Sequence, residues 1–235
     1  GGGLGLSING TRVIATERLQ LGMPETKIGL YPDAGASHFL SHCPDHLGMY
    51  LGLTGNIISV ADAIYCGLVH AQVNSDKIQN IIELLSKQDL SRDPIAKIDK
   101  IIADCETKAG VGILEQNIAT IRRCFSKDSV QAVIDALAQE NSAWAAEQLA
   151  DISTCSPTSL KITHHELTVA ATKYISDCLE MEFNLTINVL QTHDLYEGIR
   201  AVLVDKTHDA KWLPARLQDV DDAKIAQLFE IKCTL

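Results

Sequence analysis

The chain has 235 residues, of which 46% are hydrophobic and 21% charged, and its formal net charge is −10. This composition is typical of a globular protein with one large domain or two small ones. Its Lys and Arg residues are scattered rather than gathered in a basic patch, which argues against nucleic acid as a partner. No apolar run approaches the roughly 20 residues of a membrane span, which argues against a membrane partner. Seven spread cysteines without a Cys-x-x-Cys pair predict reduced thiols in an intracellular protein.

The first part of the chain mixes helix and strand signals. The stretch over residues 3–8, behind the first glycines, predicts a short helix whose N-terminus could face a ligand. Residues 12–17 are rich in β-branched side chains and predict a short strand. Residues 35–43 and 46–53 predict short helices, and Ser59 has the position of a helix N-cap. Residues 69–73 alternate in polarity like a second strand.

Beyond residue 75 strand signals almost vanish, and apolar residues recur at helical spacing. These helical patterns cover residues 77–87, 95–105, 110–123, 129–149, 159–190 and 223–230. Two prolines, Pro94 and Pro157, separate neighbouring helices. We therefore expect a mixed α/β part over residues 1–75, with a helical region over residues 76–235 packing on it.

Two carboxylates eight positions apart, Glu25 and Asp33, lie among apolar residues, glycines and prolines. Burial of an unpaired carboxylate is costly, so each of them is either solvated or has a specific role. Glu25 is interpreted either as a general base or nucleophile in a partly buried site or as a solvated turn residue. Asp33 precedes a predicted helix, so helix capping is the stronger interpretation, and capping is compatible with catalysis. Together with upstream glycines that offer N–H groups to an oxyanion, the pair suggests acyl chemistry.

A metal site has weaker support. His38, His42 and His46 recur every four residues, and on one continuous helix they would share a face. Pro44 interrupts that helix, and no carboxylate pattern completes a zinc-protease motif, so we expect no metal ligands here. The glycine triplet is not followed by Gly-Lys-Ser/Thr and therefore does not predict a nucleotide-binding P-loop.

The motifs support a family resemblance over nearly the whole chain, although residues 77–150 match only loosely. The segments that carry it are Gly1–Ser7, Met23–Gly35, Leu53–Gly55, Ala61–Val69, Ser156–Thr163, Glu197–Lys206 and Lys211–Pro214. With these segments the chain resembles the crotonase (enoyl-CoA hydratase/isomerase) superfamily and, within it, most resembles the 3-hydroxyisobutyryl-CoA hydrolase subfamily. The implied fold is α/β: the C-terminal portion of a crotonase-like ββα-spiral core, followed by a mostly α-helical C-terminal region.

The resemblance also implies roles for three residues. Gly2 matches the position whose N–H forms half of the oxyanion hole, Glu25 matches the catalytic glutamate, and Asp33 matches the second acid of the hydrolases. Hydratases of the family usually have glycine in place of Asp33, and they carry their second glutamate where this chain has Gly5. The implied activity is hydrolysis of an acyl-CoA thioester in valine breakdown. Coenzyme A is then part of the substrate, and no separate cofactor or metal is expected.

The chain starts where the family's N-terminal half should end. We therefore expect a fragment that lacks the second oxyanion donor and much of the coenzyme A surface. Two alternatives stay open: a hydratase or isomerase that acts on another acyl-CoA, and a non-catalytic helical interaction module. A homo-oligomer also stays open. The subfamily's location implies the mitochondrial matrix for a eukaryotic source and the cytoplasm for a bacterial one.

Overall fold

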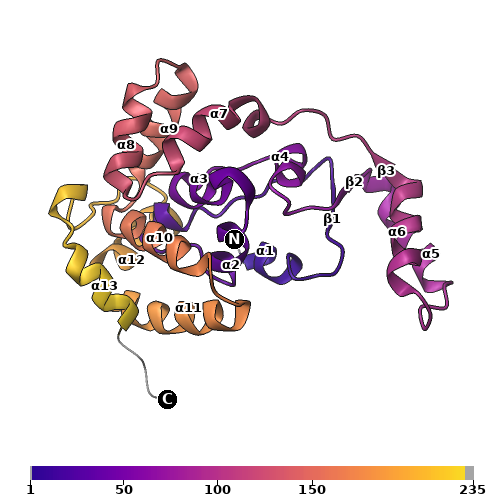
Figure 1. Ribbon diagram of the computed structural model, residues 1–235. Helices are drawn as coiled ribbons and strands as arrows, with labels where there is room; N and C mark the ends of the chain where they lie inside the picture. Colours follow the sequence, from indigo (N-terminus) through magenta and orange to yellow (C-terminus); the bar gives the residue numbers. More distant parts are fainter. Residues whose placement is uncertain (1, 231–235) are drawn as a thin grey trace.

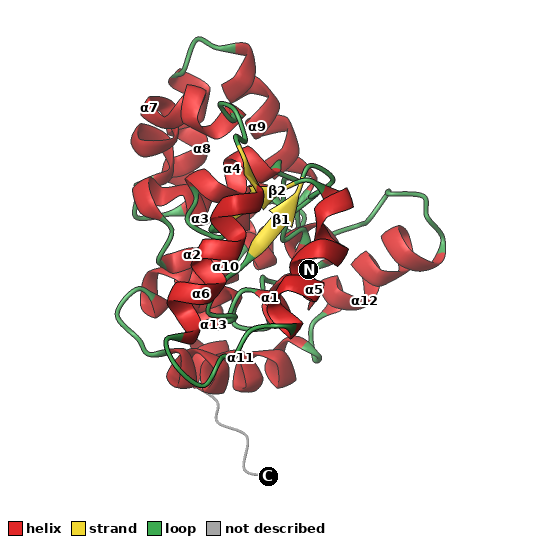
Figure 2. Ribbon diagram, turned by 90° about the vertical axis from the view of Figure 1, so that its right-hand side faces the viewer, coloured by secondary structure: helices red, strands yellow, loops and turns green. Residues whose placement is uncertain are grey.

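The computed structural model describes residues 2–230 of the chain, in which helices dominate and the sheet is small (Figures 1 and 2). The strands are β1 (Ile14–Thr16), β2 (Ala71–Val73) and β3 (Glu106–Thr107). The α-helices up to residue 75 are α1 (Gly2–Ser7), α2 (Ala36–Ser41), α3 (Leu47–Thr54) and α4 (Val60–Tyr65). Short 3-10 helices are η1 (Glu25–Ile28), η2 (Pro44–His46) and η3 (Ser75–Lys77).

The remaining elements are nearly all helical. They are α5 (Ile78–Ser86), α6 (Pro94–Cys105), α7 (Ile113–Phe125), α8 (Val130–Gln139), α9 (Ala143–Thr154), α10 (Pro157–Ala170), α11 (Ile175–Val189), α12 (His193–Gly198) and α13 (Asp222–Glu230). A π-helical segment, η4 (Ile199–Val204), continues α12, and a 3-10 turn, η5 (Leu217–Asp219), precedes α13. The expected fold class, α/β with a mostly helical C-terminal region, is confirmed.

The sheet has the order β1-β2-β3. Strands β1 and β2 are parallel, with Ile14 opposite Ala71, and β3 pairs antiparallel to β2, with Thr107 opposite Gln72. Two parallel neighbours need a long crossover connection. Here the crossover contains η1 and α2 to α4, so the segment with the two candidate acids lies within it.

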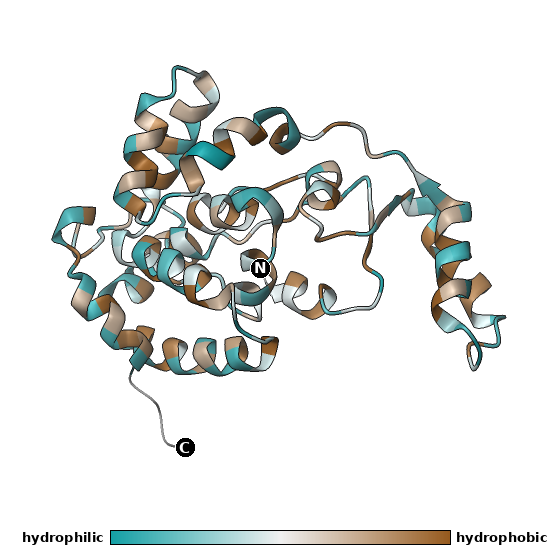
Figure 3. Cartoon of the chain, viewed as in Figure 1, coloured by the Kyte–Doolittle hydropathy of each residue, from teal (hydrophilic) through white to brown (hydrophobic). Residues whose placement is uncertain are grey.

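Most of the core is one hydrophobic cluster that includes residues of α2, α3, α4 and α7 to α10. A second cluster gathers the buried Tyr31 ring with residues of α10 and α11 such as Ile162 and Leu185. The hairpin of α5 and α6 lies to one side in Figure 1, and Ile81 and Ile101 join a third, smaller cluster there. Both hairpin helices carry brown apolar positions among teal polar ones (Figure 3).

Two of the expected helical stretches are each divided into two helices. Residues 129–149 form α8 and α9, which are separated where the hydroxyl of Ser142 accepts a hydrogen bond from Ala145 N–H and so begins a new helix. Residues 159–190 form α10 and α11, and the turn between them includes a 3.0 Å hydrogen bond from Lys173 N–H to the Ala170 carbonyl. Neither glycine nor proline marks that second break, which explains why the apolar spacing missed it.

The expectation that Asp33 caps a helix is wrong. Helix α2 begins at Ala36, and its N-cap is Gly35 in the left-handed conformation, with no capping bond from the cap's own side chain. The carboxylate of Glu182 on α11 instead accepts hydrogen bonds from the N–H groups of Gly35 and Ser37. A distant side chain therefore satisfies these donors. The expected cap at Ser59 is confirmed, because its hydroxyl accepts a hydrogen bond from Asp62 N–H.

Within residues 2–230, no helix has the length and apolar character needed to cross a bilayer. Six cysteines fall in this part of the chain, and all six are free thiols, whereas Cys233 lies outside it.

Candidate active site

Glu25 is the first residue of η1, directly after Pro24. The short helix closes with the N–H of Leu30 donating 3.0 Å to the Glu25 carbonyl, and Gly29 ends it in the left-handed conformation. The Glu25 side chain is held inside the protein, with only 8% of the residue exposed. Burial raises the pKa of this carboxyl group, and the negative charge of Asp33 raises it further. A raised pKa makes a carboxylate a better proton acceptor.

Two segments of the helical region, next to α10 and in α12, contact η1. The N–H of Ser156, just before α10, donates 3.0 Å to the carbonyl of Thr26. On the other side α12 lies so close that a Cβ on Gly29 would meet the carbonyl oxygen of Asp194 at 2.0 Å. The position of Glu25 therefore depends on residues more than 100 positions later in the chain.

Asp33 begins a tight turn. The N–H of Ala36 donates 3.1 Å to the Asp33 carbonyl, and both central residues, Ala34 and Gly35, have positive φ. This is the pattern of a type I′ turn, and Ala34 adopts a conformation that is unfavourable for a residue with a side chain. Within the described part of the chain, no group hydrogen-bonds the Asp33 carboxylate. It lies within electrostatic range of Glu25.

Helix α1 packs directly on this turn. A Cβ on Gly5 would lie 2.5 Å from the carbonyl oxygen and 2.7 Å from the Cβ of Ala34, so only glycine fits. Gly2 lies three positions earlier, on the same face of α1. It is the first residue of the helix, so its N–H has no acceptor within the helix. Gly1, the first of the three glycines, lies outside the described residues.

Two further buried glutamates were not anticipated from the sequence. Glu166 on α10 is fully buried, and neither carboxylate oxygen has a hydrogen-bond partner among residues 2–230. Burial raises its pKa well above the usual value, and the charges of Glu182 and Asp33 add to the rise. Burial also raises the pKa of Glu182, against the effect of its hydrogen bonds from Ser37 and Gly35.

A signal for both acids was present in the sequence. Glu166 lies in the buried stripe of α10 between Ile162 and Ala170, and Glu182 lies in that of α11 between Cys178 and Leu185. A carboxylate at a core position of an amphipathic helix is an uncommon pattern that points to a special environment.

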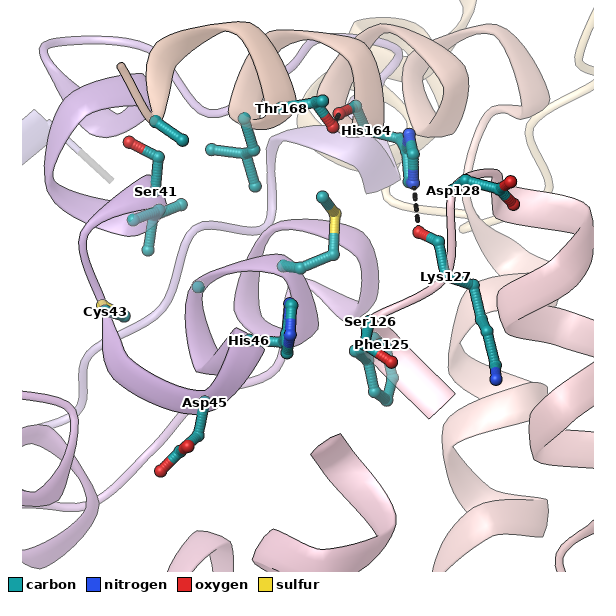
Figure 4. A pocket seen from close by; sticks show the side chains of 15 residues that line it. Ser41, Cys43, Asp45, His46, Phe125, Ser126, Lys127, Asp128, His164 and Thr168 are labelled. Carbon is teal, nitrogen blue, oxygen red and sulfur yellow. Dashed lines mark hydrogen bonds between the residues drawn. The ribbon is translucent and has the colours of Figure 1, made fainter. Parts of the chain in front are cut away.

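Two of the open cavities of the described part of the chain lie near these elements. One, of about 730 Å³, is lined by Gly2 and by residues of α1 and β1. The other, of about 500 Å³, lies between α2, α3 and α10, and Figure 4 shows His46 and His164 on its wall. Glu25 and Asp33 line neither of them. His38 and His42 have ring centroids 4.4 Å apart, but no group of three metal-binding side chains occurs within residues 2–230.

Comparison with known proteins identifies the family of the chain. The sequence matches the profile of the Enoyl-CoA hydratase/isomerase family over residues 1–229. The chain belongs to this family, the crotonase superfamily. It is 38% identical to the mitochondrial 3-hydroxyisobutyryl-CoA hydrolase of Rattus norvegicus and 37% identical to that of Homo sapiens. Each alignment covers 98% of this chain and 60% of the relative, so the chain spans about three fifths of those proteins.

Solved structures agree on the crotonase fold. A carnitinyl-CoA dehydratase from Mycobacterium thermoresistibile superposes with a TM-score of 0.87 at 33% identity, covering 97% of this chain and 64% of that one. An enoyl-CoA hydratase from Rhodobacter sphaeroides superposes with a TM-score of 0.84 at 28% identity, with the same coverage. The resemblance drawn from the sequence motifs is thereby confirmed at the level of the family and of its hydrolase relatives.

Proposed function

We propose that this chain carries the acidic half of the active site of an acyl-CoA thioester hydrolase with specificity for 3-hydroxyisobutyryl-CoA or a close relative. The observation that carries the proposal is the pair of Glu25 and Asp33. One is buried with a raised pKa, and the other has a carboxylate left free by the helix cap from Glu182. The names of the relatives with 37–38% identity support the same reaction.

In this reaction Glu25 has one of two roles. As a general base it takes a proton from water, the water oxygen bonds to the thioester carbon, and the C–S bond breaks as the sulfur receives a proton. As a nucleophile its carboxylate forms a mixed anhydride with release of the coenzyme A thiolate, and water then hydrolyses the anhydride to regenerate Glu25. Asp33 orients the substrate hydroxyl or the water in either case.

Gly2 supplies an N–H to the thioester oxygen as charge develops on it. Its place at the start of α1, on the face that meets the Asp33 turn through Gly5, supports this role. One such donor is typically worth about 10²–10³ in rate. The second donor and much of the coenzyme A contact are assigned to sequence outside this chain, which spans 60% of the hydrolase relatives.

Hydration of a double bond is the second candidate, because the two solved structures are named as a dehydratase and a hydratase. The contact between Gly5 and Ala34 argues against it. The second glutamate that the resemblance places at position 5 in hydratases has no room here, since even a Cβ would collide with Ala34.

The test follows release of the coenzyme A thiol from 3-hydroxyisobutyryl-CoA and, in parallel, hydration of crotonyl-CoA, with the longest natural form of the protein. We expect thiol release that depends on Glu25, with kcat lowered at least about 10²-fold in Glu25→Gln. The matched control is Glu83→Gln, an exposed glutamate on the α5–α6 hairpin, which leaves the rate unchanged. Hydration without thiol release would establish the second candidate, and a normal kcat in Glu25→Gln would overturn the assignment of Glu25.

A further inference from the structure

The Tyr31–Ser37 segment is bound at both ends to one residue of α11. At its start, the Tyr31 hydroxyl donates 2.7 Å to the backbone carbonyl of Glu182 and lies 2.6 Å from the Thr186 hydroxyl. At its end, the Glu182 carboxylate accepts 2.7 Å from Gly35 N–H, 3.0 Å from Ser37 N–H and 2.5 Å from the Ser37 hydroxyl. Asp33 lies between the two attachment points.

The turn needs such support. Ala34 has a φ of 59°, a conformation that persists only where the surrounding structure enforces it. The Glu182 side chain is buried and binds the N–H group directly after Ala34. Its charge strengthens each of these hydrogen bonds relative to those of a neutral acceptor.

We infer that Glu182 is a positioning residue of the proposed hydrolase, which fixes the strained Asp33–Ala34–Gly35 turn and thereby directs the Asp33 carboxylate toward the reacting group. The inference rests on the proposed function for its catalytic meaning. Because Glu182 accepts hydrogen bonds from the N–H groups at the start of α2, the Asp33 carboxylate does not act as the helix cap, a role that aspartate before a helix commonly has.

Three hydrogen bonds from Gly35 and Ser37 to the Glu182 carboxylate favour its charged form and oppose the rise in pKa that burial causes. Glu166, on α10, is near enough for the Glu182 charge to raise its pKa. Glu166 accepts no hydrogen bond within residues 2–230, so the three donors from Gly35 and Ser37 all bind the Glu182 carboxylate.

The first test reads the turn itself and does not depend on activity. Amide hydrogen exchange at Gly35 and Ser37 is measured by NMR in Glu182→Leu, which lacks the acceptor, and in Glu182→Gln, which retains one carbonyl. We expect exchange faster by about tenfold or more in the Leu variant and by less in the Gln variant, since bonds to a charged acceptor are the stronger class. The control is Asp177→Asn, an exposed carboxylate on the same helix. Unchanged exchange in both Glu182 variants would overturn the inference.

The second test measures kcat and KM of the Glu182 variants. Glu182→Leu is expected to lower kcat for thioester hydrolysis about tenfold or more, with KM changed less than about threefold, because Asp33 then acts from the wrong place in the transition state. Glu182→Gln, which preserves size and remains folded if the Leu variant does not, recovers part of the rate. A folded variant with faster amide exchange and normal kcat would overturn the positioning role. Absence of hydrolysis by the longest natural form of the protein, without any substitution, would overturn the proposed function instead, while the exchange data still decide whether Glu182 holds the turn.

Discussion

The hydroxyl of Ser156 donates a hydrogen bond of 2.5 Å to the carboxylate of Asp194, which joins the start of α10 to the start of α12 behind Glu25. The same hydroxyl caps α10 by accepting from Ser159 N–H, and the other Asp194 oxygen accepts 2.8 Å from Leu213 N–H. Both Ser156 and Asp194 are buried. Ser156 and Asp194 both contact η1 through their backbones, so their hydrogen bond stabilises the surface against which η1 packs. Neither side chain takes part in the proposed reaction.

Replacement of Ser156 by alanine should destabilise the protein by about 1–3 kcal/mol, because it removes a helix cap and leaves a buried carboxylate oxygen without its donor. Urea unfolding measures this loss. The matched control is Ser153→Ala, whose exposed hydroxyl bonds only to the Ala150 carbonyl within α9, and it should change stability by less than about 0.5 kcal/mol. Equal stability of the two variants would contradict the role given to Ser156.

Gly5→Ala should be costly because its Cβ would overlap the carbonyl oxygen of Ala34 at 2.5 Å. We expect a loss of about 1–3 kcal/mol in unfolding free energy, together with lower thioesterase activity as the Asp33 turn moves. Gly3→Ala is the matched control on the same helix, since a Cβ there meets nothing within 4 Å. It should stabilise α1 by up to about 1 kcal/mol, so denaturation curves for the two variants should shift in opposite directions.

Asp33→Asn should change the pH dependence of the reaction as well as its rate. The negative charge of Asp33 raises the pKa of Glu25, so its removal lowers that pKa. Because Glu25 reacts as the ionised form in either proposed role, the acidic limb of the kcat/KM profile moves to lower pH. The residual rate, reduced about 10²-fold, should suffice to record it. The exposed Asp76→Asn serves as control, and a limb that moves to higher pH or stays in place would argue against coupling of the two acids.

Glu166 should make the folded state less stable as pH rises. Its pKa in the folded protein lies well above its ordinary value of 4.5, so its contribution is fully present below pH 4.5 and is lost as the pH rises toward the folded pKa. The loss has a slope of up to about 1.4 kcal/mol per pH unit. Glu166→Gln removes this slope, while any effect of the amide itself is the same at every pH.

Urea unfolding of the Glu166→Gln variant between pH 4 and pH 8 tests this expectation. The stability difference between variant and wild type should grow in favour of the variant above pH 4.5. Glu83→Gln, which alters an exposed glutamate, should show the wild-type pH dependence. Parallel curves for wild type and Glu166→Gln would mean that Glu166 does not hold its proton in the folded protein.

Local sequence signals were sufficient for the elements that depend on local chemistry. The β-branched residues around Ile14 predicted β1, and Ser59 predicted the start of α4, since both signals act over a few neighbouring positions. The motif around Glu25 and Asp33 was one of seven local segments that indicated the family. These successes share one property: the determining atoms lie close together along the chain.

The support of the site could not be anticipated in the same way. Asp33 was expected to cap α2 because aspartate commonly does so, but Glu182 competes for the same N–H groups from 147 positions away from Gly35. The close approach of Gly5 to Ala34 likewise depends on how α1 is placed in three dimensions. Secondary-structure propensity describes the local preference of a residue. The capping of α2 and the need for glycine at position 5 were instead decided by contacts between segments distant in the sequence.

The hydrogen bond between Gly35 N–H and the Glu182 carboxylate also determines when, during folding, Asp33 reaches its final position. The hydrogen bond closes a loop of 147 positions, and contacts of such separation form late because the intervening chain must first be ordered. During synthesis Asp33 leaves the ribosome long before α11 exists, so the strained turn at Ala34 has no support until the last third of the chain has folded. Correct placement of this acid thus coincides with completion of the fold, and a chain interrupted before α11 would have Asp33 but not its geometry.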